Sequence, residues 1–189
     1  MHNKFPNIFY FIDKFNKDDI KKLDKSIGII YRNYENKYSL SIVKKIKKFC
    51  NYYGNKIYIA NNLKLAQKLN LNGIYIPAFN KKLSYKNLNL RKDFLILGSA
   101  HNVSEIKIKE KQGCEYIFLS PIFKTKKSKF YLNTVKFNYL SNFTKKKIIA
   151  LGGINSNNLR KIKSTKANGF ASISYIKKNG PKINLGRFK

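Results

Sequence analysis

Cysteine, histidine and long apolar runs are all scarce in this chain of 189 residues. The two cysteines, Cys50 and Cys114, show no CxxC spacing and no companion histidine cluster, which argues against a zinc site or a disulfide framework. We expect both to be buried as small hydrophobic residues. No stretch reaches the roughly 20 apolar residues that a membrane span needs, and the N-terminus lacks the apolar run of a signal peptide. The sequence therefore predicts a cytoplasmic protein without a membrane partner.

Acidic residues are also few, because 9 Asp and Glu stand against 40 Lys and Arg, for a formal net charge of +31. Such an excess attracts polyanions, including nucleic acids. The lysines are scattered through every segment, however, and no basic arm or nucleic-acid-binding motif stands out. We interpret the charge as compositional and expect no specific nucleic acid partner, whereas phosphorylated small-molecule substrates would be attracted by the same field. The sequence leaves the oligomeric state open.

Short β-branched or aromatic runs alternate with lysine-rich segments of helical periodicity along the whole chain. The clearest helix covers residues 40–50, and its expected buried face comprises Ile42, Val43, Ile46, Phe49 and Cys50. The expected strands are residues 7–13, 26–33, 56–60, 73–76, 94–99, 116–120, 147–151 and 169–174.

Eight repeats of strand then helix are typical of a parallel sheet, and near-continuous apolar strands suit burial on both faces. We predict the α/β class and a single small (β/α)8 TIM barrel, with one domain over residues 1–189. The alternative is an open doubly wound sheet, but no GxGxxG follows the first expected strand to support a dinucleotide site.

A pair of glycines follows the seventh expected strand and ends at Gly153. Glycine permits close backbone approach, and a following helix capped by Asn155 or Ser156 would direct free N–H groups toward the loop, which favours an anion site. TIM barrels often bind phosphate with the loops after strands 7 and 8, and the latter contains Ile173 and Ser174. The alternative is a glycine turn that serves only the geometry between strand and helix.

Three motifs in the second half of the chain, taken together, resemble the thiamine-phosphate synthase/TenI family. Residues 98–101 read GSAH, near the family's G-x-S-x-H, and residues 150–154 read ALGGI, as in A-x-G-G-I. Between them, residues 115–129 read EYIFLSPIFKTKKSK, near D-Y-I-x-x-x-P-x-F-x-T-x-[ST]-K. The first and the longest motif each differ from the family in length by one residue, and Glu115 replaces an aspartate. The resemblance is specific from about residue 97 to residue 176.

The resemblance implies that hydroxymethylpyrimidine pyrophosphate and hydroxyethylthiazole phosphate are joined to thiamine phosphate, with pyrophosphate leaving before the thiazole nitrogen attacks. Catalysis would then consist mainly of charge neutralisation and positioning. The groups implied at the leaving pyrophosphate are Lys129, Ser99 and Arg32. Arg32 matches the arginine of the family's Q-x-R-x-K, which reads IYRNY at residues 30–34 and so lacks the glutamine and the lysine. The residues implied to hold the thiazole phosphate are Thr125, Ser128, Gly153, Ile173 and Ser174.

The family's metal-binding residues are poorly matched. Asn61 and Asn80 occupy the positions at which the resemblance implies magnesium-binding carboxylates, and no acid occurs between Glu35 and Asp93. Magnesium prefers anionic oxygen ligands, so we name no protein ligand for Mg²⁺ and expect it to bind weakly unless the substrate supplies the charge. His101 is expected to orient its loop rather than to bind metal.

Three functions therefore remain open. The first is a divergent thiamine-phosphate synthase, which Pro121 and the segment 125–129 favour, because they resemble the synthase form of this loop. The second is a TenI-like thiazole tautomerase, which would place a histidine where this chain has Pro121 and so lacks its expected acid/base group. The third is a non-catalytic barrel that binds phosphate or thiazole phosphate.

Overall fold

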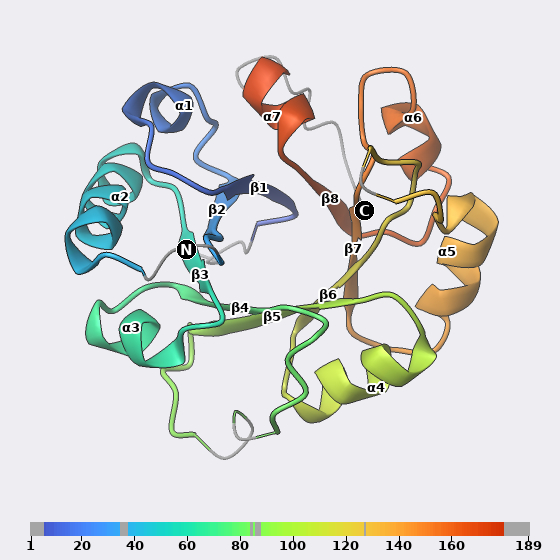
Figure 1. The fold of residues 1–189 in the computed structure, drawn as a ribbon, viewed down its shortest axis with the longest axis horizontal. Helices are drawn as coiled ribbons and strands as arrows, with labels where there is room; N and C mark the ends of the chain where they lie inside the picture. The colour runs from blue at the N-terminus through green and yellow to red at the C-terminus, as the bar shows by residue number, and fades with distance from the viewer. Residues whose placement is uncertain (1–5, 35–37, 84, 86–87, 127, 180–189) are drawn as a thin grey trace.

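A closed barrel of eight parallel strands forms the centre of the molecule (Figure 1). The computed structural model describes residues 6–34, 38–83, 85, 88–126 and 128–179. The strands are β1 (Ile8–Ile12), β2 (Ile27–Tyr31), β3 (Ile57–Ala60), β4 (Gly73–Ile76), β5 (Leu95–Ala100), β6 (Tyr116–Leu119), β7 (Lys147–Leu151) and β8 (Gly169–Ser172). Each strand pairs in parallel with the next, and β8 closes the barrel on β1. The predicted TIM barrel is confirmed, and the open doubly wound alternative is wrong.

Helices surround most of the barrel in Figure 1. In the described part of the chain they are α1 (Lys17–Lys21), α2 (Leu40–Tyr53), α3 (Leu63–Lys68), α4 (Val103–Lys111), α5 (Asn133–Ser141), α6 (Leu159–Ile162) and α7 (Ser174–Asn179). On the side between α3 and α4, where the chain runs from β4 to β5, the described residues contain no helix, so one of the eight expected helices is replaced there by a loop.

The helix α2 extends three residues beyond the predicted end, to a left-handed Gly54 that terminates it. Val43, Ile46 and Cys50 form its buried face as predicted. The prediction was wrong for Ile42, which is 37% exposed, because it lies at the edge of that face.

The barrel interior is filled by aromatic side chains. Phe9 and Phe118 meet edge to face with their ring centroids 5.1 Å apart, and Phe11 and Tyr75 do the same at 5.1 Å. Because these rings occupy the interior, the barrel is a packed core and not a pore. Any ligand must therefore bind at an end of the barrel, among the loops.

A second apolar layer lies between the strands and the helices, and it contains both cysteines. Cys50 and Cys114 are free and buried, as predicted. Burial raises the pKa of each thiol to about 12, so both stay protonated and unreactive near neutral pH. None of the described helices is long and apolar enough to cross a membrane.

Candidate functional site

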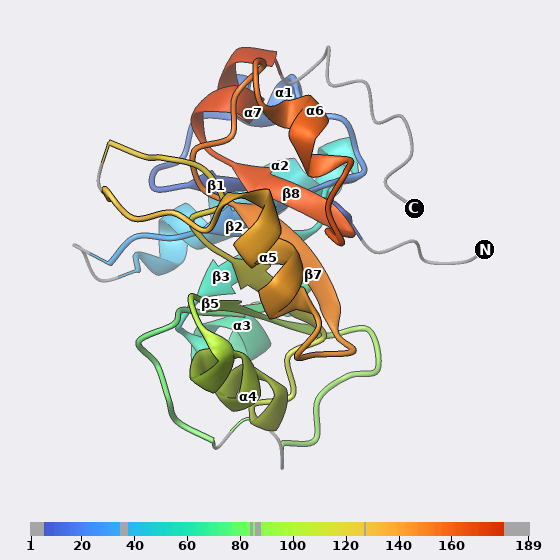
Figure 2. The ribbon, with the colours of Figure 1, turned by 90° about the vertical axis from the view of Figure 1, so that its right-hand side faces the viewer.

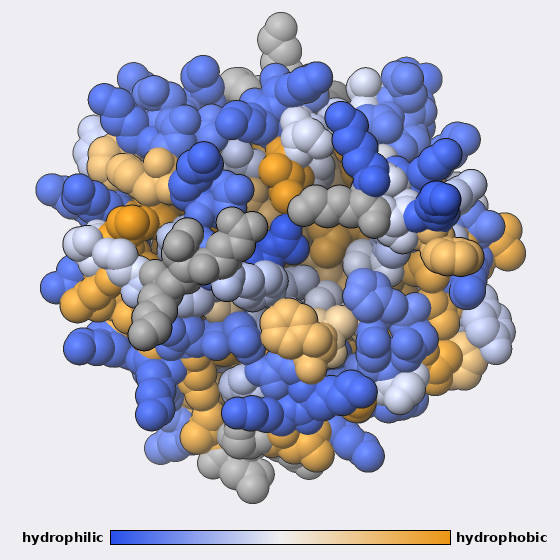
Figure 3. All heavy atoms as spheres, in the orientation of Figure 1, coloured by the Kyte–Doolittle hydropathy of each residue, from blue (hydrophilic) through white to orange (hydrophobic). Residues whose placement is uncertain are grey.

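The carboxyl ends of all eight strands lie at one end of the barrel, which we call the mouth. Figure 2 shows the barrel from the side, with the loop between β6 and α5 projecting from the mouth. Figure 3 views the mouth from outside, where hydrophilic side chains predominate around a central hollow. Every residue predicted for the site follows or ends a strand at the mouth, namely Arg32, Ser99, Thr125, Ser128, Lys129, Gly153, Ile173 and Ser174. Their roles in binding and catalysis stay predictions.

Arg32 follows β2 and lies over the aromatic floor of the mouth. Its guanidinium carbon is 4.8 Å from the ring centroid of Phe11 and 6.0 Å from that of Tyr34. Its backbone N–H donates a 2.8 Å hydrogen bond to the carbonyl of Ile12, at the end of the neighbouring strand. Attraction between the cation and the ring faces holds the guanidinium above the packed interior. A positive group is thus fixed near the centre of the mouth.

Ser99 lies close to Arg32 through a shared neighbour, Tyr75. The serine is 5% exposed near the end of β5, and its hydroxyl forms a hydrogen bond with the Tyr75 phenol. Burial raises the pKa of Tyr75, and the hydrogen bond with Ser99 and the positive charge of Arg32 oppose that rise. Tyr75 was not singled out in the sequence, because it stands inside an apolar strand with no motif around it. A ligand can reach Ser99 only at the very base of the mouth.

The hydroxyl groups predicted to bind phosphate make hydrogen bonds within the loop between β6 and α5. Thr125 Oγ1 accepts a 3.0 Å hydrogen bond from the backbone N–H of Ser128, and Ser128 Oγ donates to the carbonyl of Phe130 at 2.8 Å. The Thr125 hydroxyl proton is still available to an anion, whereas Ser128 would have to rotate to donate. Lys129 is exposed on the same loop. An open pocket on this loop is lined by Lys124, Thr125, Lys126, Ser128, Lys129 and Tyr131.

Gly153 lies against the same loop and explains why glycine is needed there. Its φ is +70°, and a Cβ on it would lie 2.5 Å from the carbonyl oxygens of Phe123 and Lys124. From the sequence, we expected this glycine to allow close approach to an anion. The structure shows that the backbone of the loop after β6 makes the close approach. Substitution of Gly153 would therefore disturb packing as well as any anion site, so a Gly153→Val variant cannot test phosphate binding alone.

The helix after β7 begins later than predicted. We expected Asn155 or Ser156 to cap it, but α6 starts at Leu159, with Asn158 as its N-cap residue. Asn155 Oδ1 instead accepts hydrogen bonds from the backbone N–H groups of Asn157 and Asn158, at 2.9 and 3.2 Å. This side chain closes a local turn in place of the first helical turn. This turn leaves fewer free backbone N–H groups available to an anion than the predicted helix N-terminus would.

The eighth strand ends at Ser172, two residues before the predicted end. Ser172 Oγ accepts a 3.3 Å hydrogen bond from the backbone N–H of Tyr175, and this contact helps to turn the chain into α7. Ile173 lies at the bend and Ser174 begins the helix, both exposed at the mouth. They are therefore placed on the loop side of β8, as a phosphate contact requires.

His101 joins two loops of the mouth, in line with the predicted orienting role. Its Nδ1 lies 2.7 Å from the carbonyl oxygen of Ser120, and its backbone N–H donates to Glu105 at 2.7 Å. Through these contacts the loop after β5 supports the start of the loop after β6.

The two asparagines at the implied metal positions hydrogen bond to each other. Asn80 Nδ2 donates to Asn61 Oδ1, and the backbone N–H of Lys82 donates to Asn80 Oδ1 at 3.0 Å. No cluster of three or more His, Cys, Asp or Glu side chains suited to a metal occurs among the described residues. Both amide oxygens are thus engaged and no carboxylate replaces them, so this donor set does not fit a magnesium ion.

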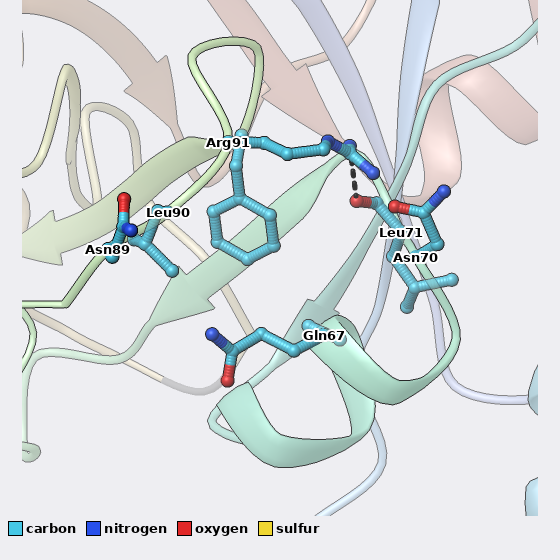
Figure 4. A pocket seen from close by; sticks show the side chains of 8 residues that line it. Gln67, Asn70, Leu71, Asn89, Leu90 and Arg91 are labelled. Carbon is cyan, nitrogen blue, oxygen red and sulfur yellow. Dashed lines mark hydrogen bonds between the residues drawn. The ribbon is translucent and has the colours of Figure 1, made fainter.

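A separate pocket lies at the opposite end of the barrel, between α3 and the connection from β4 to β5 (Figure 4). The Arg91 guanidinium crosses it to donate a 3.2 Å hydrogen bond to the carbonyl of Leu71, and it pairs with Asp93 at 2.7 Å. Because its residues precede β4 and β5, this pocket is not part of the mouth.

Comparisons with known proteins agree with the fold and the motifs. The sequence profile of the family described as thiamine monophosphate synthase matches residues 23–176. The thiamine-phosphate synthase of Pelagibacter ubique is 29% identical over 180 residues, covering 94% of this chain and 86% of that protein. That of Methanococcus vannielii is 27% identical over 139 residues, 72% of this chain and 67% of that protein.

Among solved structures, thiamine phosphate pyrophosphorylase from Pyrococcus furiosus superposes with a TM-score of 0.75 at 17% identity, covering 95% of this chain and 93% of that one. The corresponding protein from Bacteroides thetaiotaomicron gives a TM-score of 0.64 at 19% identity, over 97% and 90% of the two chains. These likenesses support the barrel fold. The profile match spans most of the chain, and the chain belongs to the thiamine monophosphate synthase family.

Proposed function

We propose that this protein is a divergent thiamine-phosphate synthase, which joins hydroxymethylpyrimidine pyrophosphate to hydroxyethylthiazole phosphate at the mouth of the barrel. The observation that carries the proposal is the position of Arg32, 4.8 Å above the Phe11 ring at the mouth. Ser99 and the loop bearing Thr125 and Lys129 stand at the ends of other strands around the same mouth. A cation held over the floor of such a site suits a pyrophosphate leaving group.

In the proposed reaction, the bond between the pyrimidine methylene carbon and the pyrophosphate oxygen breaks, and its electron pair leaves with the pyrophosphate. The lone pair of the thiazole nitrogen then forms the new bond to that carbon. Arg32 and Lys129 neutralise the departing charge, and Thr125 donates a hydrogen bond to the thiazole phosphate. No step is assigned to a metal ion, because the residues at Asn61 and Asn80 do not fit one.

The test is a turnover assay with both purified substrates, in which thiamine phosphate and pyrophosphate are measured with and without added magnesium. Arg32→Met should lower kcat/KM roughly 100- to 1,000-fold, the usual loss when one group that stabilises developing charge is removed. The matched control is Lys45→Met, which makes the same charge change on the exposed side of α2. Absence of product with the unaltered protein under both conditions would reject the synthase.

A second candidate is a barrel that binds thiazole phosphate without turnover, and the hydrogen-bonded Asn61 and Asn80 favour it. In that case calorimetry should show binding of thiazole phosphate while the turnover assay stays blank. A blank turnover assay together with absent binding of thiazole phosphate would reject both candidates.

A further inference from the structure

The loop that follows β4 is fastened to α4 by buried polar groups. Lys109 is 0% exposed, and its Nζ donates to the carbonyls of Pro77 and Asn80, at 2.8 and 2.9 Å, and to Gln112 Oε1 at 2.8 Å. Gln112 Nε2 in turn donates to the carbonyls of Asn80 and Lys82, at 2.9 and 2.8 Å. Four hydrogen bonds from these two side chains thus hold the loop, and a fifth joins the two side chains to each other. The connection has no helix among the described residues.

The barrel wall is shaped to admit the buried lysine. Gly98 of β5 faces it, and a Cβ at this position would lie 2.7 Å from Lys109 Cδ and 2.7 Å from Cys114 Sγ. The aliphatic part of the lysine therefore crosses the strand where there is no side chain. Burial of a charged ammonium is costly unless its hydrogen bonds are satisfied, and the three acceptors provide this.

On its other side the same loop presents Asn80 to Asn61. Asn80 Nδ2 donates to Asn61 Oδ1 and, at 2.9 Å, to the Tyr85 hydroxyl. Asn80 Oδ1 accepts from the backbone N–H of Lys82, which fixes the orientation of the amide, since only its nitrogen can then face Asn61. Asn61 is itself held in a left-handed conformation, with φ at 56°, and its N–H donates to the Tyr75 carbonyl.

These contacts use the oxygens at this corner that a hard cation would need. Asn61 Oδ1 and Asn80 Oδ1 both accept hydrogen bonds, and the Asn80 carbonyl accepts two. The Lys109 ammonium stands 2.9 Å behind that carbonyl and repels a second positive charge. A divalent ion would have to break the amide contact and approach a lysine without any carboxylate to compensate.

We propose that the Asn61 and Asn80 amides seal the corner of the mouth between β3 and β4 against divalent cations, with Lys109 and Gln112 as positioning residues behind them. Anion binding at the mouth then requires no magnesium. The inference concerns ion binding, and it holds whether or not the proposed transfer reaction occurs. Its failure is therefore distinguishable from that of the synthase proposal, which rests on turnover.

The first experiment titrates the unaltered protein with Mn²⁺, a paramagnetic substitute for magnesium, and follows free Mn²⁺ by electron paramagnetic resonance. We expect no saturable binding below about 1 mM, the weak end of the range for protein sites that bind hard divalent cations. Calorimetry with inorganic pyrophosphate, with and without magnesium, should show equal or weaker affinity when magnesium is present, because the ion competes with the protein for the anion. Saturable Mn²⁺ binding in the micromolar range, or tighter pyrophosphate binding with magnesium, would overturn the proposal.

The second experiment opens the corner with the double variant Asn61→Asp/Asn80→Asp, which supplies two carboxylates and removes the amide donor. Its Mn²⁺ affinity should exceed that of the unaltered protein at least about tenfold. The control is Asn51→Asp/Asn142→Asp, which adds the same charge at exposed sites near the ends of α2 and α5, away from the mouth. An equal gain in the control would mean that overall charge alone governs Mn²⁺ binding, and the proposal would fail. Thermal melts check that both variants fold, and the titration of the unaltered protein decides the proposal if one does not.

Discussion

Replacement of Gly153 by alanine isolates the contact that joins the loops after β6 and β7. The structure imposes two penalties on this change. The left-handed φ of +70° disfavours any side chain, and the new Cβ would lie 2.5 Å from the carbonyl oxygens of Phe123 and Lys124. Backbone oxygens cannot rotate away as a side chain can, so one of the two loops must move.

The two penalties are separated by a matched variant, Gly113→Ala. Gly113 has a φ of +79°, but a Cβ there would meet only Ile96 Cδ1, at an ordinary 3.7 Å. A left-handed alanine costs about 1–2 kcal/mol, and a forced overlap adds about 1–3 kcal/mol. For a chain of this size, 1 kcal/mol lowers Tm by roughly 2–4 °C. We expect Gly113→Ala to melt about 2–8 °C below the unaltered protein, and Gly153→Ala a further few degrees lower.

Thermal denaturation followed by circular dichroism measures both variants, and pyrophosphate calorimetry measures the mouth. If the loop packing is as described, Gly153→Ala also weakens pyrophosphate binding, because Lys129 belongs to the displaced loop. Gly113→Ala should leave binding unchanged. Equal melting temperatures for the two variants would refute the reasoning, since the contact with the loop after β6 would then contribute nothing.

Three other predictions follow from charge and burial. Burial lowers the pKa of Lys109 from 10.5 to about 8, so between these pH values the unfolded chain binds more protons and the free energy of unfolding rises with pH. Urea denaturation should therefore show the unaltered protein gaining stability relative to Lys109→Met from about pH 8 to pH 10, and a constant difference would contradict this. Binding of duplex DNA should be weak and without sequence preference, and it should weaken steeply as the salt concentration rises. A salt-resistant or sequence-selective complex in a gel-shift assay would show that the net charge of +31 serves a specific partner. His101→Ala should lower Tm by a few degrees, because the contact of the imidazole with the Ser120 carbonyl is lost. His101→Asn keeps a polar group near that carbonyl. Recovery of Tm in this second variant would show that the hydrogen bond, and not packing, accounts for the loss.

The strands were predictable because they are buried on both faces. A parallel barrel strand reads as a short continuous apolar run, and the predicted bounds of β4 and β7 match the observed ones. The eighth strand was extended too far, because Ile173 continues the apolar pattern while the Ser172 hydroxyl has already turned the chain toward α7. The periodicity of apolar residues indicates which positions are buried. It does not indicate where a side chain forms a hydrogen bond with the backbone and ends a strand.

The site was predictable in position but not in its contacts. Parallel strands bring their carboxyl ends together, so motif order alone placed Ser99, Lys129 and Gly153 at one mouth. The bond between Ser99 and Tyr75 and the contact of Gly153 with the loop after β6 join residues more than twenty positions apart. No local sequence pattern indicates that such residues are in contact, so these contacts could be identified only from the fold.

The same limit applies to the lysine excess, which composition alone could not assign to any role. One lysine, Lys109, is buried and fastens the loop after β4, while Lys129 stays exposed at the mouth. Arg32 follows β2 and lies over Phe11 at the mouth. In the proposed site, the Arg32 guanidinium and the ammonium groups on flexible lysine side chains would neutralise an anion without a metal ion. They would not impose the fixed coordination geometry that a metal ion imposes. The position of a bound phosphate would then depend on directional donors such as the Thr125 hydroxyl. Thr125→Val keeps a similar shape but removes both the hydroxyl proton and the acceptor of the Ser128 N–H. We therefore expect it to disturb ligand orientation more than removal of any single exposed lysine.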